Sequence, residues 1–222
     1  MIPYKVTIDK ERGIFLVQGD FNPNAIPINI PLDDTDRQKF IDYFLHKADI
    51  DDAFSFLQFI SADKSNMMNK ALFIAGLNSA MKTFKPSNAR MQSLKNEFIK
   101  QFPELADDLK HFESLRNKHY MHDDNGMIEA TAFLLLNPEG SPVKFGGPPS
   151  VVWNSMHLNY YAESQRLQRF LCSVGNYIVN QIDSIADQIA NRYAETERDI
   201  LERFGPPPLK LASTQDIDKT RK

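Results

Sequence analysis

The sequence has a single cysteine, Cys172, in 222 residues. One cysteine excludes an intramolecular disulfide and, with it, a disulfide framework or a cysteine-rich zinc site. The formal net charge is −3, so no overall basic field indicates nucleic-acid binding. No apolar run approaches the ~18 residues of a membrane-spanning helix, and the first residues lack the basic-then-apolar pattern of a secretion signal. We therefore expect a soluble, cytoplasmic protein with no membrane partner.

Hydrophobic residues make up 42% of the chain and charged residues 25%, a balance that predicts a sizeable core and excludes a mainly disordered protein. The length suits one large domain, or one domain with an appendage. Apolar runs at 4–8 and 14–18 flank a turn and predict an N-terminal β appendage over 1–32. Helical spacing dominates 33–204. Consecutive prolines and a polar sequence then predict a disordered tail over 205–222.

Capping residues, prolines and glycines divide the helical part into segments. The segment over 65–84 is apolar nearly all round, which is typical of a central helix, so we expect Met67 and Met68 at its start to fill the core. The last segment would measure roughly 70 Å if unbroken, so we expect a break near Gly175 or a stretch used for a partner. The expected helices cover about 33–46 (capped by Asp33, Asp34 or Thr35), 53–60, 65–84, 87–102 (capped by Ser87), 103–121 and 157–204.

Between the last two expected helices, the apolar pattern changes to that of β-structure. Residues 128–136 form an apolar run, a turn signal at 137–140 reverses the chain, and 143–145 can return it. Residues 151–153 are a candidate third strand. The sequence thus predicts a mainly α protein: a helical bundle with an inserted β-hairpin at about 127–154 and a small N-terminal β-hairpin appendage.

Three of the five histidines fall near the end of the helix expected over 103–121. The apolar stripe that includes Phe112 and Leu115 continues, at helical spacing, to His119 and His122. Arg116 precedes His119 by three residues and therefore lies beside it. Two imidazoles and a guanidinium are thus expected to gather at the end of one helix, where buried polar groups need partners.

This combination suits the cleavage of a phosphodiester by the adjacent ribose hydroxyl, which needs a base, an acid and charge stabilisation but no metal. Arginine offers a fixed fork of donors to a phosphate, and histidine moves protons near neutral pH. The segment 82–119 holds eight Lys or Arg against five Asp or Glu. A structural explanation stays open, because the helix dipole alone favours cations at a C-terminus by roughly 0.3–1 kcal/mol each.

The run Arg116-Asn117-Lys118-His119-Tyr120-Met121-His122, followed by acidic residues 123–124, resembles the signature of the HEPN superfamily. The helix over 71–84, with its continuation to Arg90, is similar to the first core helix of that family, and the resemblance covers about 65–200. It implies a helical bundle that often dimerises, with two motifs facing each other across the interface. Many members are metal-independent endoribonucleases of toxin–antitoxin and phage-defence systems, whereas others bind nucleotides or have lost catalysis.

By position, the resemblance implies that Arg116, Asn117 and His122 are catalytic. His122 would take or give the proton, Arg116 would stabilise the charged phosphorane, and Asn117 would orient them. Lys118 and His119 are expected to bind the substrate. We therefore expect a HEPN-like RNA-binding protein that acts as a metal-independent endoribonuclease of toxin or defence type, without a cofactor, and with an antitoxin or regulatory protein as a candidate partner.

The alternative function is a non-catalytic helical dimer that acts as an interaction or scaffold protein. A homodimer is expected in either case, because the final helix offers more apolar surface than one bundle of this size can cover. The residues that carry this expectation are Val174, Ile178, Ile182, Ile185 and Ile189.

Two other chemistries are less well supported by the residues. His119, His122, Asp123 and Asp124 include metal-ligand types, but a metal-dependent phosphohydrolase needs a further upstream His and a distant Asp. We therefore expect no metal site. Cys172 follows an apolar pair in a helix and has no evident His partner nearby, so we expect a packed side chain rather than a nucleophile.

Overall fold

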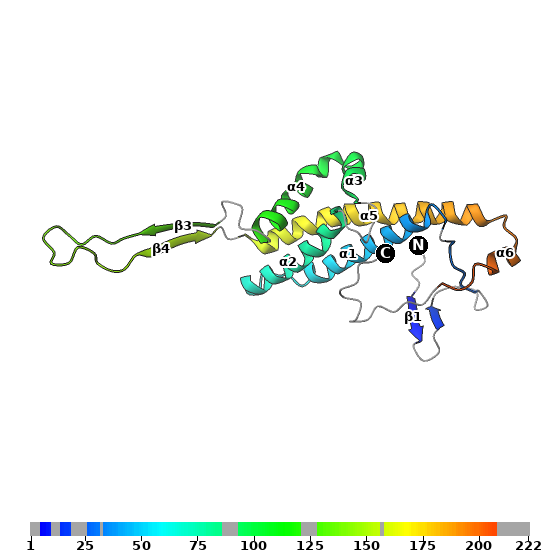
Figure 1. The fold of residues 1–222 in the computed structure, drawn as a ribbon, viewed down its shortest axis with the longest axis horizontal. Helices are drawn as coiled ribbons and strands as arrows, with labels where there is room; N and C mark the ends of the chain where they lie inside the picture. Colours follow the sequence, from blue (N-terminus) through cyan, green and yellow to red (C-terminus); the bar gives the residue numbers. More distant parts are fainter. Residues whose placement is uncertain are drawn as a thin grey trace. The chain divides into compact units, whose positions relative to one another are not determined.

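The computed structural model describes residues 5–9, 14–18, 26–31, 33–85, 93–120, 128–155 and 158–207, and it is mainly helical with two small antiparallel sheets (Figure 1). The chain divides into two compact units. The first unit comprises 1–48, 85–93 and 175–222, and the second comprises 49–84 and 94–174. No helix in the described part of the chain combines the length and the apolar character that crossing a membrane requires.

The first unit contains the N-terminal hairpin that the sequence predicts. Strand β1 (Lys5–Asp9) pairs antiparallel with β2 (Ile14–Gln18), and Thr7 lies opposite Leu16. Further along the chain, the Asn29 amide donates to the Gly205 carbonyl at 2.7 Å. The tail expected beyond this point falls largely on residues 208–222, which lie outside the described part.

Helix α1 (Arg37–Leu57) is continuous, although the sequence suggested two helices with a gap between His46 and Ala53. The gap contains neither proline nor glycine. Ile50 and Ala53 are 1% and 0% exposed, so the buried stripe runs on through the expected gap. Burial of this stripe therefore favours one long helix.

Helix α5 (Tyr160–Tyr193) is also longer than expected and passes through Gly175 without a break. One glycine in a helix costs only about 1 kcal/mol, which packing on both sides offsets. The interruption comes instead after Tyr193, before the short α6 (Arg198–Glu202). The five apolar residues that suggested a dimer surface are at most 9% exposed within the single chain, so they do not supply that surface.

The second unit carries most of the remaining elements. They are α2 (Asn66–Met81), the 3₁₀ turn η1 (Lys82–Phe84), α3 (Lys95–Gln101), the 3₁₀ turn η2 (Pro103–Leu105), α4 (Ala106–Ser114), the π-helix η3 (Leu115–Tyr120), β3 (Ile128–Phe133) and β4 (Ser150–Ser155). Ser65 caps α2, because its hydroxyl accepts from the Met68 amide at 3.3 Å. Pro103 begins η2, which leads directly into α4.

Two expectations about the second unit are wrong. Met67 and Met68 are 82% and 53% exposed rather than in the core, because they lie in the first turn of α2, ahead of its buried residues. The helix expected over 87–102 begins only at Lys95 in the described part; Leu94 instead donates its amide to the Thr83 carbonyl. The expected cap, Ser87, lies outside the described residues.

Four phenylalanines form the centre of the core of the second unit. The ring of Phe170 lies 5.8 Å from that of Phe84, 5.9 Å from that of Phe98 and 5.7 Å from that of Phe112. All four side chains are at most 1% exposed. Phe170 brings α5 into contact with α3 and α4. Two residues further along α5, Cys172 is exposed, contrary to expectation, because the buried positions of this turn are taken by Phe170 and Leu171.

Helices α1 and α2 approach closely at Gly76. A Cβ atom at this position would lie 2.8 Å from Leu57 Cγ and 3.2 Å from the Ala53 carbonyl oxygen. Leu57 is fully buried and cannot move aside freely.

Gly76→Ala should therefore lower the free energy of unfolding, by up to about 2 kcal/mol, in urea denaturation. Overpacking costs about 1–3 kcal/mol and outweighs the ~1 kcal/mol that alanine gains in a helix. Gly147→Ala is the control, since no atom would lie within 4 Å of the added methyl group. A stabilised Gly76→Ala variant would contradict the close approach.

The inserted hairpin exists, but its pairing differs from the sequence-based expectation. Strand β3 pairs antiparallel with β4, so residues 151–153 belong to the partner strand rather than to a third one. Residues 143–145 return the chain through only a single bridge, Leu136 to Phe145. The apolar run 134–136 simply continues the hairpin toward its turn. The sequence indicated that the chain reverses in this segment, but it did not indicate which residues of the two strands pair.

Candidate functional site

The segment with the HEPN-like signature directly follows helix α4. This helix has Asp107 and Asp108 in its first turn, where the helix dipole favours acids. It buries Leu109 and Phe112 in the core. Helix α4 continues directly into η3, in which hydrogen bonds span five residues instead of four. The wider turn changes which side chains share a face, and such turns are frequent at functional sites.

Arg116 and Asn117 are joined by a hydrogen bond in η3. Arg116 Nη1 donates to Asn117 Oδ1 at 2.8 Å, and both residues are half-buried. Arg116 Nε is buried and has no hydrogen-bond partner among the described residues. A partly desolvated guanidinium with donors to spare is suited to an anionic ligand.

The other signature residues lie outside what the structure describes. His122 is outside the described residues altogether. For Lys118 and His119 the backbone belongs to η3, but their side chains are not described. The structure thus brings together Arg116 and Asn117 and leaves the positions of the three other side chains as predictions.

Tyr120, at the end of η3, is a neighbour that the sequence analysis did not single out. Its ring lies 6.3 Å from that of Phe73, and the Tyr160 ring lies 5.9 Å from the same phenylalanine. Burial raises the pKa of Tyr120 well above its usual value, and the neighbouring Tyr160 and Glu163 raise it further. Tyr120 therefore keeps its proton at neutral pH and cannot act as a general base.

Ion pairs connect α4 to the first turns of α5 within the second unit. Arg166 Nε donates to Asp108 Oδ1 at 2.8 Å, and His111 Nε2 lies 2.9 Å from Glu163 Oε2. His111, the first of the three clustered histidines, thus has a structural partner. Arg116 differs from Arg166 in lacking a carboxylate partner among the described residues.

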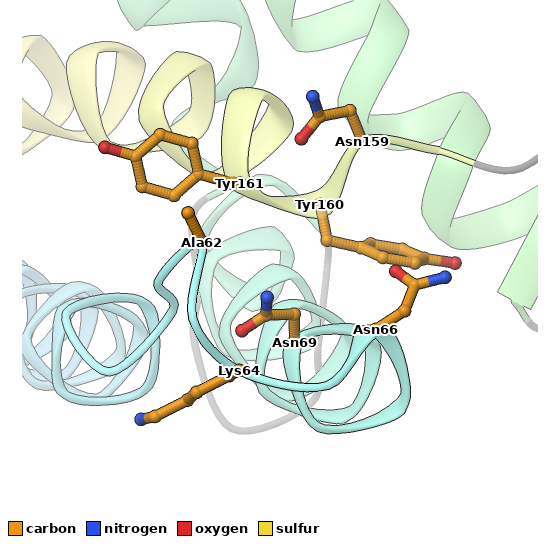
Figure 2. Close-up of a pocket in the computed structure, with 7 residues that line it drawn as sticks. All are labelled: Ala62, Lys64, Asn66, Asn69, Asn159, Tyr160 and Tyr161. Carbon is orange, nitrogen blue, oxygen red and sulfur yellow. The ribbon is translucent and has the colours of Figure 1, made fainter.

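A surface pocket of about 370 Å³ lies beside the start of α5 (Figure 2). Its lining residues are Ala62, Lys64, Asn66, Asn69, Asn159, Tyr160 and Tyr161. They come from the loop after α1, from the first turns of α2 and from the start of α5. The rings of Tyr160 and Tyr120 both contact the ring of Phe73, so Phe73 connects the wall of the pocket to η3. Sequence reasoning missed this pocket because its residues are about 90 positions apart.

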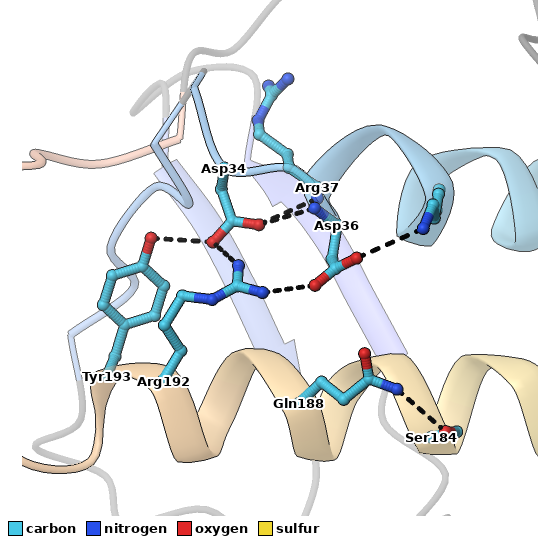
Figure 3. A network of polar contacts seen from close by, with 8 residues as sticks. Asp34, Asp36, Arg37, Ser184, Gln188, Arg192 and Tyr193 are labelled. Carbon is cyan, nitrogen blue, oxygen red and sulfur yellow. Dashed lines mark hydrogen bonds and ion pairs between the residues drawn. The ribbon is translucent and has the colours of Figure 1, made fainter.

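A separate polar cluster lies in the first unit (Figure 3). The Arg192 guanidinium binds Asp34 Oδ2 at 2.5 Å and also pairs with Asp36. Tyr193 donates its hydroxyl proton to Asp34 Oδ2 at 2.8 Å, and Asp34 Oδ1 accepts from the Arg37 amide at 3.2 Å. Of the three candidate caps, Asp34 therefore caps the start of α1 and also ties it to the end of α5.

Acid should weaken this cluster. Burial alone would raise the pKa of Asp34, but hydrogen bonds from Arg192, the Asp36 amide and Tyr193, with the Arg192 charge, lower it from 3.8 to about 2. The stabilisation is present above about pH 4, declines as the unfolded chain takes up a proton, and is lost below about pH 2. Because the Arg192 side chain is 39% exposed, we expect a contribution of about 1–2 kcal/mol after screening.

Urea denaturation between pH 7 and 2 measures this contribution. Asp34→Asn is the matched variant, since it retains an Oδ1 acceptor for the helix cap but cannot titrate. The stability difference between the two proteins should shrink as the pH falls from about 4 to 2. A difference that stays constant over this range would contradict the assignment.

No group of three or more His, Cys, Asp or Glu in the described part of the chain is placed to hold a metal ion. The side chains of His119, His122, Asp123 and Asp124 are outside that part, so the metal alternative raised for them is not addressed by this observation. Comparisons with protein-family models, with curated proteins and with solved structures found no match to this chain.

Proposed function

We propose that the protein is a HEPN-like helical bundle that binds RNA in the cytoplasm and cleaves it without a metal ion. The observation that carries this proposal is the half-buried Arg116, which is oriented by Asn117 and has a buried Nε without a described partner. A half-buried guanidinium keeps further N–H donors at its Nη atoms, and a phosphate oxygen would accept hydrogen bonds from them. A toxin or defence role would give the protein an antitoxin or regulatory partner.

In the proposed reaction, the ribose 2′-hydroxyl attacks the adjacent phosphorus and the bond to the 5′ oxygen breaks, which leaves a 2′,3′-cyclic phosphate. One proton leaves the attacking hydroxyl and one is delivered to the departing oxygen. His122 either takes the proton from the attacking hydroxyl or gives one to the departing oxygen, and water exchanges the other proton. Arg116 stabilises the charge that accumulates on the phosphorane. Asn117 orients the guanidinium, and Lys118 and His119 bind the strand.

Incubation of the purified protein with total RNA in excess chelator tests this proposal. Wild-type protein should shorten the RNA, and Arg116→Ala should leave it intact. Activity that disappears in chelator and returns with manganese would overturn the metal-free mechanism and favour metal binding by His119, His122 and Asp123. Binding of RNA without cleavage under any condition would favour a degenerate binding module.

The β3–β4 hairpin favours the second candidate function, an interaction protein. Its described large apolar side chains are all 39–69% exposed. They are Phe133, Leu134, Leu135, Leu136, Val143, Phe145, Val151 and Val152. A two-stranded hairpin is marginally stable alone in water, and apolar surface of this extent marks an interface.

We propose a second copy of this chain as the occupant of this surface. Eight large apolar side chains that are each 39–69% exposed leave on the order of several hundred Å² per chain, comparable with the ~800 Å² that each partner of a standard interface buries. Residues 128–155 include two acids and one base, so neither RNA nor an anionic membrane is favoured. Four further exposed apolar side chains on the same unit can meet the partner's hairpin: Phe56, Phe59, Met67 and Met68.

Light scattering at micromolar concentration should therefore give twice the 25.5 kDa of one chain. The double variant Leu135→Lys, Val151→Lys should give a monomer, because each lysine would place a charge in the interface. Ser141→Lys adds a charge at an exposed polar position of the hairpin and should remain dimeric. A monomeric wild-type protein would exclude the dimer.

A further inference from the structure

We infer that the pocket between α2 and the start of α5 binds one nucleobase of a single-stranded RNA. The inference rests on the proposed RNA binding and adds to it a specificity site with residues of its own. The pocket, at about 370 Å³, lies at the lower end of the sizes typical of small-molecule sites. That size suits a base with part of its ribose.

Three side chains offer groups to a ligand. Asn159 uses Oδ1 to accept from the Ala162 amide at 3.1 Å and so caps α5, while its Nδ2 has no hydrogen bond to the described residues. Asn66 is exposed in the first turn of α2, and its amide is likewise without a partner in the described part. Tyr161 is 45% exposed and lines the pocket on the side of Ala62, whereas Asn66 lies beside the ring of Tyr160 (Figure 2).

The rest of the lining is fixed by contacts within the unit. Asn69 Nδ2 donates to the Ser61 carbonyl at 2.8 Å, and Asn69 is only 6% exposed. Tyr160, also 6% exposed, packs against Phe73. The pocket is thus largely preformed, which lowers the entropic cost of binding.

The chemistry of the lining matches a base rather than a free phosphate or an apolar ligand. Side-chain amides present a donor and an acceptor together, as the edge of a nucleobase does. Unpaired bases of RNA are typically stacked on aromatic rings and hydrogen-bonded along their edges. Among the described residues, the only charged one in the lining is Lys64, whose ammonium donates to the Phe59 carbonyl and lies 5.4 Å from the Phe59 ring centroid. The described lining has no carboxylate that would repel the phosphates of a strand.

The pocket is also connected to the signature segment. Tyr160 lines the pocket and packs against Phe73, and the ring of Tyr120, the last residue of η3, packs against the same phenylalanine. A base held by the pocket would therefore fix the strand next to the segment that carries Arg116. The pocket would select the nucleotide near the cleaved bond, whereas Arg116 would act on the phosphate.

Fluorescence anisotropy with short 2′-O-methyl homopolymers of A, C, G and U tests the inference, because these strands bind but cannot be cleaved through a 2′-hydroxyl. Wild-type protein should prefer one base. Tyr161→Ala should weaken that binding about tenfold or more, since it removes a stacking ring. Tyr161→Phe keeps the ring and should bind within about threefold of wild type.

Asn159→Asp distinguishes a role in base recognition from a role in capping α5. It keeps the oxygen that caps α5 and loses the Nδ2 donor. It should change the order of preference among the four strands. Asn96→Asp on α3 introduces the same charge at an exposed site outside the pocket and serves as its control. Thermal unfolding of each variant should match wild type within a few degrees.

The outcomes distinguish this inference from the proposed cleavage. Base-selective binding that depends on Tyr161, without any cleavage of natural RNA, supports the pocket and overturns the nuclease. Cleavage that depends on Arg116, with Tyr161→Ala and Asn159→Asp both binding as wild type, overturns the pocket and leaves the nuclease. Absence of binding to all four strands, or equal binding of all four, also overturns the pocket.

Discussion

Replacement of His122 by alanine is expected to slow RNA cleavage by about 10²–10⁴-fold, the range that general acid–base catalysis contributes. Arg116→Ala should cost a comparable ~10²–10³-fold, because charge stabilisation at a reacting phosphate accounts for that much. Both losses should appear in excess chelator. Single-turnover rates on a defined RNA, with protein in excess over substrate, measure the chemical step directly.

Two variants sharpen this prediction. Arg116→Lys keeps the charge but loses the planar fork and the Nη1 donor to Asn117, so it should recover little activity. His119→Ala is the internal control. If His119 binds the strand without transferring a proton, its loss should weaken the affinity for RNA more than it lowers the cleavage rate of the bound RNA. Unchanged rates for both His122→Ala and Arg116→Ala would refute the catalytic assignment.

Phe170→Ala is expected to produce the largest loss of stability, about 3–5 kcal/mol, which is typical of truncating a buried phenylalanine. Phe170 is 1% exposed and is in ring contact with Phe84, Phe98 and Phe112. Its removal would leave a cavity that three helices and a 3₁₀ turn cannot close together. Urea denaturation gives the free energy if the variant remains folded, and circular dichroism shows directly if it does not.

Phe133→Ala in the hairpin is the matched control, since the same atoms are removed from a side chain that is 39% exposed. Measured in the monomeric Leu135→Lys, Val151→Lys background, its free energy of unfolding should change by less than about 1 kcal/mol, because few neighbours within the chain lose contacts. Phe170→Leu should lie between the two variants. A cost for Phe133→Ala equal to that of Phe170→Ala would show that the hairpin packs as tightly as the core.

Local signals in the sequence were sufficient for much of the secondary structure. Pro103 before an acidic first turn and the apolar runs of the N-terminal hairpin each indicated the element observed. These signals are local because a cap or a helix start depends on the backbone of the next few residues. The mainly helical fold class could therefore be predicted from the sequence.

The features that were predicted wrongly depend on which side chains are buried in the folded chain. Helix α1 continues through its expected gap and α5 continues through Gly175, because the buried stripe persists on each side. Met67 and Met68 are hydrophobic but exposed, and Cys172 is small but exposed. Composition shows what a side chain can bury, whereas only the packed neighbours determine what it does bury.

For the candidate site, the sequence places Arg116 and Asn117 next to each other. Adjacent residues in a helical segment can form the hydrogen bond that joins their side chains. The sequence also determined the resemblance that assigns a role to His122. Only the tertiary structure decided the π-helical form of η3, the shared contact of Tyr120 and Tyr160 with Phe73, and the pocket that gathers Asn66, Asn159 and Tyr161. The physical reason is distance along the chain: neighbours in sequence are held together by covalent geometry, whereas residues about 90 positions apart meet only after the core has formed around them.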